Sequence, residues 1–121
     1  MAKILLVDDE PNIVMALEYA LKKKGFDVFI ALSGKEAIDI CHEQQPCLMV
    51  LDIMMPKMDG FEVMEKIKSN TATQNIKTIF LSAKNKPEDI EKGLQAGAVE
   101  YLTKPFSTRK LIEQITEYCK N

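Results

Sequence analysis

The stretch LMVLDIMMPKMDG, residues 48–60, ends a continuous apolar run on a single carboxylate, Asp52. A strand that is buried on both faces has apolar residues at every position, whereas a strand with one solvated face alternates. Residues 47–51 are therefore predicted to form a central strand of a parallel sheet. The methionines, Pro56 and Gly60 that follow are typical of a loop. This prediction places Asp52 at the tip of a buried strand.

Short apolar runs alternate with amphipathic segments along the rest of the chain. Four further runs have the length and composition of strands: KILLV at 3–7, DVFIA at 27–31, IKTIFLS at 76–82 and VEYLT at 99–103. Apolar residues recur at helical spacing after each run, with Pro11, Ser33 and Pro87 as expected helix starts and Gly25 and Gly97 as expected helix ends. The alternation predicts an α/β fold, a doubly wound parallel sheet of five strands with five helices on its two faces.

The bulk composition excludes several classes of protein. At 121 residues the chain is expected to form one domain, residues 1–121. Its net charge of −2 and the lack of a lysine or arginine stripe argue against nucleic-acid binding. No run approaches the ~20 apolar residues that span a bilayer, so no membrane span is expected. Cys41, Cys47 and Cys119 lack metal-ligand spacing and are predicted to be free thiols in a reducing cytoplasm.

Polar side chains follow four of the predicted strands. In order along the chain these are Asp8, Asp9 and Glu10, then Asp52, then Ser82, and finally Lys104. The carboxyl ends of parallel strands share one edge of a sheet, so all of these side chains are expected at that edge. If the first and third strands are neighbours, the acids lie within a few ångströms of one another. Like charges at close range need either a shared proton or a bound cation. Carboxylate oxygens without histidine or thiolate ligands suit Mg²⁺.

A magnesium ion at this edge would recruit a phosphoryl group, because Mg²⁺ binds through a few carboxylates together with phosphate oxygens. Lys104 would supply a second positive charge to that group, and the Ser82 hydroxyl a hydrogen bond. Asp52 is then the predicted nucleophile, and its product would be an aspartyl phosphate.

Four motifs in order carry a family resemblance: VDDE at 7–10, VLDIMMPKMDG at 50–60, LSA at 81–83 and YLTKPF at 101–106. Over essentially its whole length the chain resembles the receiver domain of bacterial two-component response regulators. The resemblance implies a single flavodoxin-like domain with strand order 2-1-3-4-5. It also implies a cytoplasmic phosphoacceptor switch that catalyses only its own phosphorylation and dephosphorylation.

The resemblance implies a role for each residue of the site. Asp52 would accept a phosphoryl group from a histidine kinase or a histidine phosphotransfer protein. Lys104 and Ser82 would hold the phosphoryl oxygens, and the Lys104–Pro105 bond would be cis. Tyr101 would be a switch residue whose rotamer follows Ser82. The implied ligands of Mg²⁺ are Asp8, Asp9, Asp52 and the backbone carbonyl of Met54.

Two other functions are weighed against the switch. A phosphatase with an aspartyl nucleophile, similar to the haloacid dehalogenase family, needs an acid two residues after the nucleophile, and Met54 stands there. A nucleotide or flavin binder needs a glycine-rich first turn, but the turn after Val7 is Asp-Asp-Glu-Pro. For individual residues, Asp8 and Asp9 could cap the first helix, and Tyr101 could be an aromatic at the edge of the core.

The output is expected to be a shift in a pre-existing equilibrium of the fourth helix, fifth strand and fifth helix. In one DNA-binding subfamily an arginine matches Gln114 and an acidic pair matches Val99 and Glu100. The partial loss of that charged surface favours a monomer. Met54, together with Met55 and Met58, could form a lip for a partner or simply pack the loop.

Overall fold

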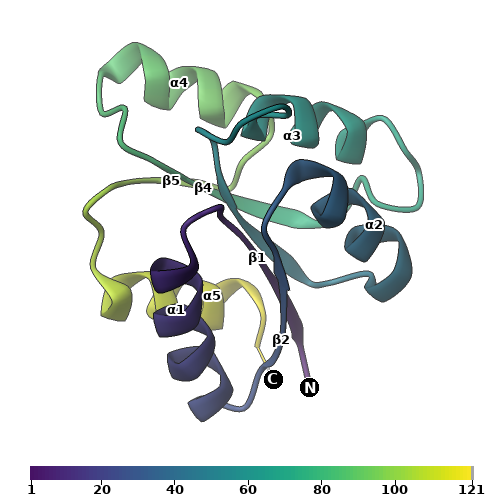
Figure 1. Cartoon of the computed structure of the whole chain (residues 1–121), viewed down its shortest axis with the longest axis vertical. Coiled ribbons are helices and arrows are strands. Elements are labelled where there is room, and N and C mark those ends of the chain that lie inside the picture. The colour runs from purple at the N-terminus through teal and green to yellow at the C-terminus, as the bar shows by residue number, and fades with distance from the viewer. Residues whose placement is uncertain (121) are drawn as a thin grey trace.

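The computed structural model describes residues 1–120 and confirms the predicted α/β fold (Figure 1). The strands form one parallel sheet in the order β2-β1-β3-β4-β5. Their bounds are β1 Lys3–Val7, β2 Asp27–Ala31, β3 Leu48–Asp52, β4 Lys77–Ser82 and β5 Glu100–Thr103. The helices are α1 Pro11–Lys23, α2 Gly34–Gln44, α3 Gly60–Lys68, α4 Pro87–Gln95 and α5 Thr108–Tyr118. Three strands start one residue later than predicted, and β3 includes Asp52.

The helices cover both faces of the sheet, as right-handed crossovers require. Figure 1 shows α1 and α5 on one face and α2, α3 and α4 on the other. Alternate residues of each inner strand enter the two apolar layers: Leu5 and Val7 pack with one, Ile4 and Leu6 with the other. All of β3 is buried. This explains why residues 48–51 are apolar without alternation.

The helix starts follow the predicted signals. Pro11 and Pro87 are the first residues of α1 and α4. Ser33 caps α2, since its hydroxyl oxygen accepts a hydrogen bond of 3.2 Å from the Glu36 N–H. Asp59 caps α3 in the same way. α1 and α4 end two residues before Gly25 and Gly97, both of which have positive φ.

Gly60 sets the distance between α3 and the end of β3. A Cβ atom at this position would lie 2.7 Å from Ile53 Cα, a backbone atom that has no room to move. The Gly60 N–H also donates a hydrogen bond of 2.9 Å to the Ile53 carbonyl oxygen. Glycine therefore lets the first turn of α3 lie directly against the loop that follows Asp52.

The cysteines correct one prediction. Cys47 and Cys119 form a disulfide across a sequence separation of 72 residues, so the expectation of three free thiols was wrong. The fold brings the start of β3 and the end of α5 together on one face, which no cysteine spacing reveals. Cys41 is free and buried, and burial raises the pKa of its thiol to about 12.

Among residues 1–120, no helix has the length and apolar character needed to cross a bilayer.

Candidate functional site

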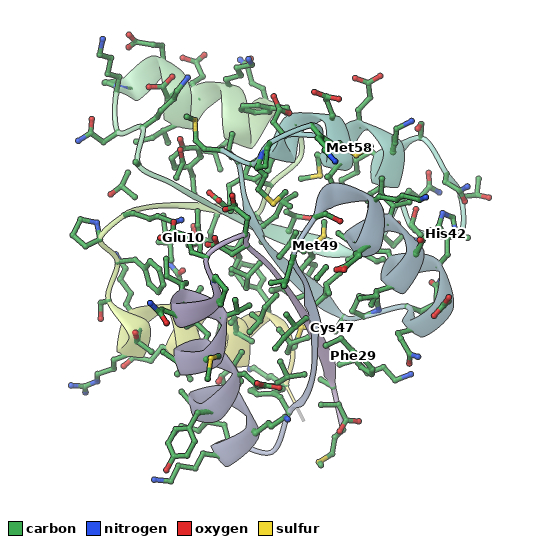
Figure 2. All side chains as sticks on the ribbon, viewed as in Figure 1. Glu10, Phe29, His42, Cys47, Met49 and Met58 are labelled. Atoms are coloured by element: carbon green, nitrogen blue, oxygen red, sulfur yellow. A yellow bond between two sulfur atoms is a disulfide. The ribbon has the colours of Figure 1, made fainter. Side chains whose placement is uncertain are left out.

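The acidic residues meet at the carboxyl ends of β1 and β3, which are neighbours in the sheet. Asp8 directly follows β1, and Asp52 is the last residue of β3. Their exposed fractions are only 3% and 2%. Asp9 and Glu10 are exposed, and Figure 2 labels Glu10 at this edge. The sheet thus delivers two buried carboxylates and two solvated ones to one place, as the sequence predicted.

Short backbone turns orient the two buried carboxylates. Asp8 Oδ1 accepts a hydrogen bond of 2.9 Å from the Glu10 N–H. Asp52 Oδ1 accepts one of 3.3 Å from the Met54 N–H. The N-cap position of α1 is Glu10, and its side chain makes no capping hydrogen bond. In residues 1–120, the Asp8 side chain therefore accepts its hydrogen bond within the turn that precedes α1, and it does not occupy the N-cap position.

Lys104 is the cation that holds the cluster together. Its Nζ atom lies 3.1 Å from Asp8 Oδ2, 3.1 Å from Glu10 Oε1 and 3.5 Å from Asp52 Oδ1. The backbone N–H of Lys104 donates a hydrogen bond of 2.8 Å to the Ser82 carbonyl oxygen, and this bond connects the end of β5 to the end of β4. The peptide bond between Lys104 and Pro105 is cis, as expected.

Burial and a neighbouring acid make the charged form of Asp52 unfavourable despite the nearby ammonium group. Burial and the neighbouring Asp8 carboxylate raise the pKa of Asp52 from 3.8 to about 6, although Lys104 opposes the shift. Burial lowers the pKa of Lys104, but hydrogen bonds to Glu10 and Asp8 and the charge of Asp52 outweigh it, so the net shift is upward. The lysine stays charged, and the site favours a further cation.

The side chains present fit a hard divalent cation. One carboxylate oxygen from each of Asp8, Asp9 and Glu10 can be chosen so that all lie within 4.8 Å of one another. These donors are all oxygen, which suits Mg²⁺. The sequence prediction combined Asp8 and Asp9 with Asp52 and the carbonyl of Met54. Glu10 lies in the side-chain cluster in addition to Asp8 and Asp9, and Asp52 is linked to these acids through Lys104.

Ser82 and Tyr101 both bind the backbone of one residue, Lys84. The buried Ser82 hydroxyl oxygen accepts a hydrogen bond of 3.1 Å from the Lys84 N–H. The Tyr101 hydroxyl donates one of 2.9 Å to the Lys84 carbonyl oxygen. The Tyr101 ring packs edge-on against Phe80, with ring centroids 6.4 Å apart. Tyr101 is therefore both an aromatic at the edge of the core and a contact to the loop before α4.

The comparisons with known proteins agree with this geometry. The sequence profile of the response regulator receiver domain matches residues 4–116. The chain belongs to this family.

Solved structures of receiver domains superpose on the whole chain. The receiver domain of Francisella response regulator 1452 is 31% identical, with a TM-score of 0.91 over 98% of this chain and 96% of that one. Chemotaxis protein CheY4 of Vibrio cholerae is 28% identical, with a TM-score of 0.90 over 98% and 99% of the two chains. The BeF3-activated DrrB receiver domain is 30% identical, with a TM-score of 0.89 over 100% and 99%.

Two features of this receiver domain went beyond the sequence prediction. Glu10 was placed at the strand edge without a role, yet it is a direct partner of Lys104; its position after Asp8 and Asp9 is the only signal. The methionine loop divides in two. Met54 is 55% exposed, whereas Met55 is buried, so Met54 is the one that faces solvent and Met55 packs the loop.

Proposed function

We propose that this receiver domain, residues 1–121, is a phosphoacceptor switch in which Asp52 takes a phosphoryl group from a phosphohistidine. Receiver domains work with histidine kinases in two-component systems, so a histidine kinase or a histidine phosphotransfer protein is the proposed donor. The observation that carries the proposal is the position of Asp52. It is a buried carboxylate at the end of a rigid strand, 3.5 Å from a lysine ammonium and beside an acidic cluster.

The proposed transfer begins with attack by Asp52 on phosphorus. The Met54 N–H and the Lys104 ammonium both contact Oδ1 of Asp52. We therefore assign the attack to Oδ2. An O–P bond forms as the P–N bond of the phosphohistidine breaks, and the departing imidazole takes a proton. Transfer of this kind depends on position and charge, which is what a preorganised cluster supplies.

Asp8 and Asp9 would hold Mg²⁺, with Glu10 beside them and with Asp52 and the Met54 carbonyl added to the ligand set. The bound ion would neutralise charge on the transferred group. Lys104 now lies between Asp8 and Asp52, and a small movement would place its ammonium on a phosphoryl oxygen. Lys104 would then exchange a carboxylate partner for a phosphoryl oxygen.

The switch would start at Ser82. The Ser82 hydroxyl oxygen accepts a hydrogen bond from the Lys84 N–H, and this bond would be lost if the side chain rotates to donate its hydroxyl hydrogen to the phosphoryl group. The loop at Lys84 would then move, and Tyr101 would lose its acceptor. In this way the β4–α4 loop, which contacts both side chains, would link phosphorylation to the surface of α4, β5 and α5. The BeF3-activated relative supports the proposal, because beryllofluoride has the shape and charge of a phosphoryl group.

The partner class implies that the chain acts in the cytoplasm, where a histidine kinase obtains its phosphoryl group. The phosphatase alternative gains no support, because Met54 occupies the position of the required acid and is exposed. We keep the switch as the single proposed function.

Incubation with acetyl phosphate and Mg²⁺ followed by intact mass measurement tests the proposal. The parent chain should gain one phosphoryl group, and Asp52→Asn should gain none. Asp39→Asn is the matched control, because Asp39 is an exposed acid on α2. Modification of Asp52→Asn at the parental rate would show that another residue is the acceptor.

A further inference from the structure

The disulfide lies at the end of the sheet opposite to the acidic cluster. Cys47 directly precedes β3, whose other end is Asp52, and Cys119 directly follows α5. Figure 2 shows Cys47 and Glu10 well apart. The bridge is therefore remote from the proposed phosphoryl chemistry, but it joins two elements that lead to it: β3 ends at Asp52, and α5 begins four residues after Lys104.

Besides the bridge, Tyr118 attaches the carboxyl end of α5 to the sheet, and one of its partners is the side chain of Glu100 at the start of β5. Lys77 Nζ donates a hydrogen bond of 3.1 Å to the Tyr118 carbonyl oxygen. The Tyr118 hydroxyl donates a long one, 3.4 Å, to the Val99 carbonyl oxygen. Ile115 is buried against the sheet. These contacts would keep the helix against the sheet without the sulfur bridge, and its last turn, at the end of the helix, would be the part that opens locally.

The two bridged residues differ in exposure. Cys119 is 3% exposed, whereas Cys47 is half-buried, so we take Cys47 as the side from which a thiol would attack. Cys41 does not compete, because it is fully buried in the apolar layer on the other face of the sheet. The backbone of Cys47 is held at the sheet, because its N–H donates a hydrogen bond of 2.9 Å to the Lys3 carbonyl oxygen. Opening of the bridge would therefore release the last turn of α5 and leave β3 in place.

We propose that Cys47 and Cys119 are a site of reversible oxidation, in which a dithiol reductant opens the bridge and releases the end of α5. In a reducing cytoplasm a disulfide of this kind is usually transient. The inference rests on the proposed function in one respect, the location of the chain in the cytoplasm. A thiolate of the reductant attacks the sulfur of Cys47, the S–S bond breaks, and Cys119 leaves as a thiolate that takes a proton.

The second thiol of the reductant then attacks the mixed disulfide. Cys47 is released and protonated, and the reductant becomes a disulfide, so two electrons and two protons have passed to the chain. In the oxidised form the last turn of α5 is fixed to the start of β3. In the reduced form that turn opens more often, and the surface formed by α5 becomes less rigid.

Thiol counting tests the chemistry. The oxidised chain, unfolded and treated with iodoacetamide, should take one label, on Cys41. After incubation of the folded chain with dithiothreitol it should take three, and renewed oxidation should restore one. Three labels on a chain never exposed to reductant, or one label after the folded chain has been incubated with dithiothreitol, would each overturn the proposal. The first result means that no bridge forms, and the second means that the bridge is inaccessible.

Amide hydrogen exchange tests the consequence. Reduction should speed exchange at residues 115–119 by at least roughly tenfold and leave β3 unchanged. Cys119→Ser should behave as the reduced parent under both conditions, and Cys41→Ser should respond to redox state as the parent does. Equal exchange in oxidised and reduced parent would refute the release of α5. Neither measurement involves phosphorylation, so failure here is distinct from failure of the acetyl phosphate experiment.

Discussion

The ammonium nitrogen of Lys104 lies 3.5 Å from Asp52 Oδ1, farther than its 3.1 Å approach to Asp8 Oδ2. In the unphosphorylated chain this lysine is therefore bound more closely to the acid after β1 than to the proposed acceptor. It bridges the ends of β1 and β3 from its own place after β5. Its removal should affect both the stability of the fold and the proposed signal.

Lys104→Met should remain folded but lose about 1–3 kcal/mol of unfolding free energy near neutral pH, because two buried carboxylates lose a partner. Addition of Mg²⁺ should recover part of the loss. Chemical denaturation with and without the metal measures both effects. Lys35→Met is the control, since Lys35 is an exposed lysine on α2. Equal stability of Lys104→Met and the parent would mean that the lysine does not hold the cluster together.

Asp52 should make stability depend on pH in a defined window. Its pKa is about 6 in the folded chain and about 3.8 without the fold, so the folded state binds the proton more tightly. Its contribution to stability is therefore largest below about pH 4 and is lost as pH rises through about 6. The ionised carboxylate then costs on the order of 3 kcal/mol.

The variant Asp52→Asn lacks this cost. It should be more stable than the parent at pH 8, and the difference should shrink as the pH falls toward 4. Denaturation curves across this range give the comparison, with Asp39→Asn as the matched control. A difference between Asp52→Asn and the parent that stays constant with pH would contradict the raised pKa of Asp52.

Asp9 and Glu10 separate two versions of the metal site. We expect Asp9→Asn to weaken Mg²⁺ binding at least about tenfold. Glu10→Gln should weaken it much less, because Glu10 Oε1 already lies 3.1 Å from the Lys104 ammonium. Titration calorimetry measures both affinities. Equal losses would show that the cluster of Asp8, Asp9 and Glu10 binds the ion as a unit.

Gly93 and Tyr101 should be strongly coupled. A Cβ atom at position 93 would lie 2.5 Å from Tyr101 Cδ2, so Gly93→Ala has to displace the ring and break its hydrogen bond to Lys84. The expected cost is about 1–3 kcal/mol. In a Tyr101→Ala background the same substitution should cost much less. A double-mutant cycle measures the coupling. Additive effects would show that the Tyr101 ring can adopt another position without a loss of stability.

The main features of the fold could be predicted from the sequence because each signal was local. The unbroken apolar run before Asp52 marked a strand buried on both faces, and Ser33 and Pro87 marked helix starts. The strand-end residues followed from two steps: parallel strands bring their carboxyl ends to one edge, and the strand order implied by the family resemblance makes β1 and β3 neighbours, which brings Asp8 and Asp52 together.

The remaining features depend on contacts between distant segments. Cys47 and Cys119 are 72 residues apart, and an odd number of cysteines gives no pairing. The hydrogen bond from the Tyr101 hydroxyl to Lys84 ends on a backbone carbonyl oxygen, which every residue type has. The amino acid at position 84 therefore could not predict it. The bond from Glu10 to Lys104 depends on a rotamer at the start of α1. None of these contacts leaves a periodic pattern in the sequence.

The complete burial of β3 has a consequence for how the length of this strand can vary. Successive side chains of a strand point to opposite faces, and Leu51 and Val50 already enter different apolar layers. Deletion of one residue before Asp52 would turn every following side chain around and aim the carboxylate at the wrong layer. Deletion of two would restore its direction. The length of this strand can therefore change only by an even number of residues if the Asp52 side chain is to keep its direction.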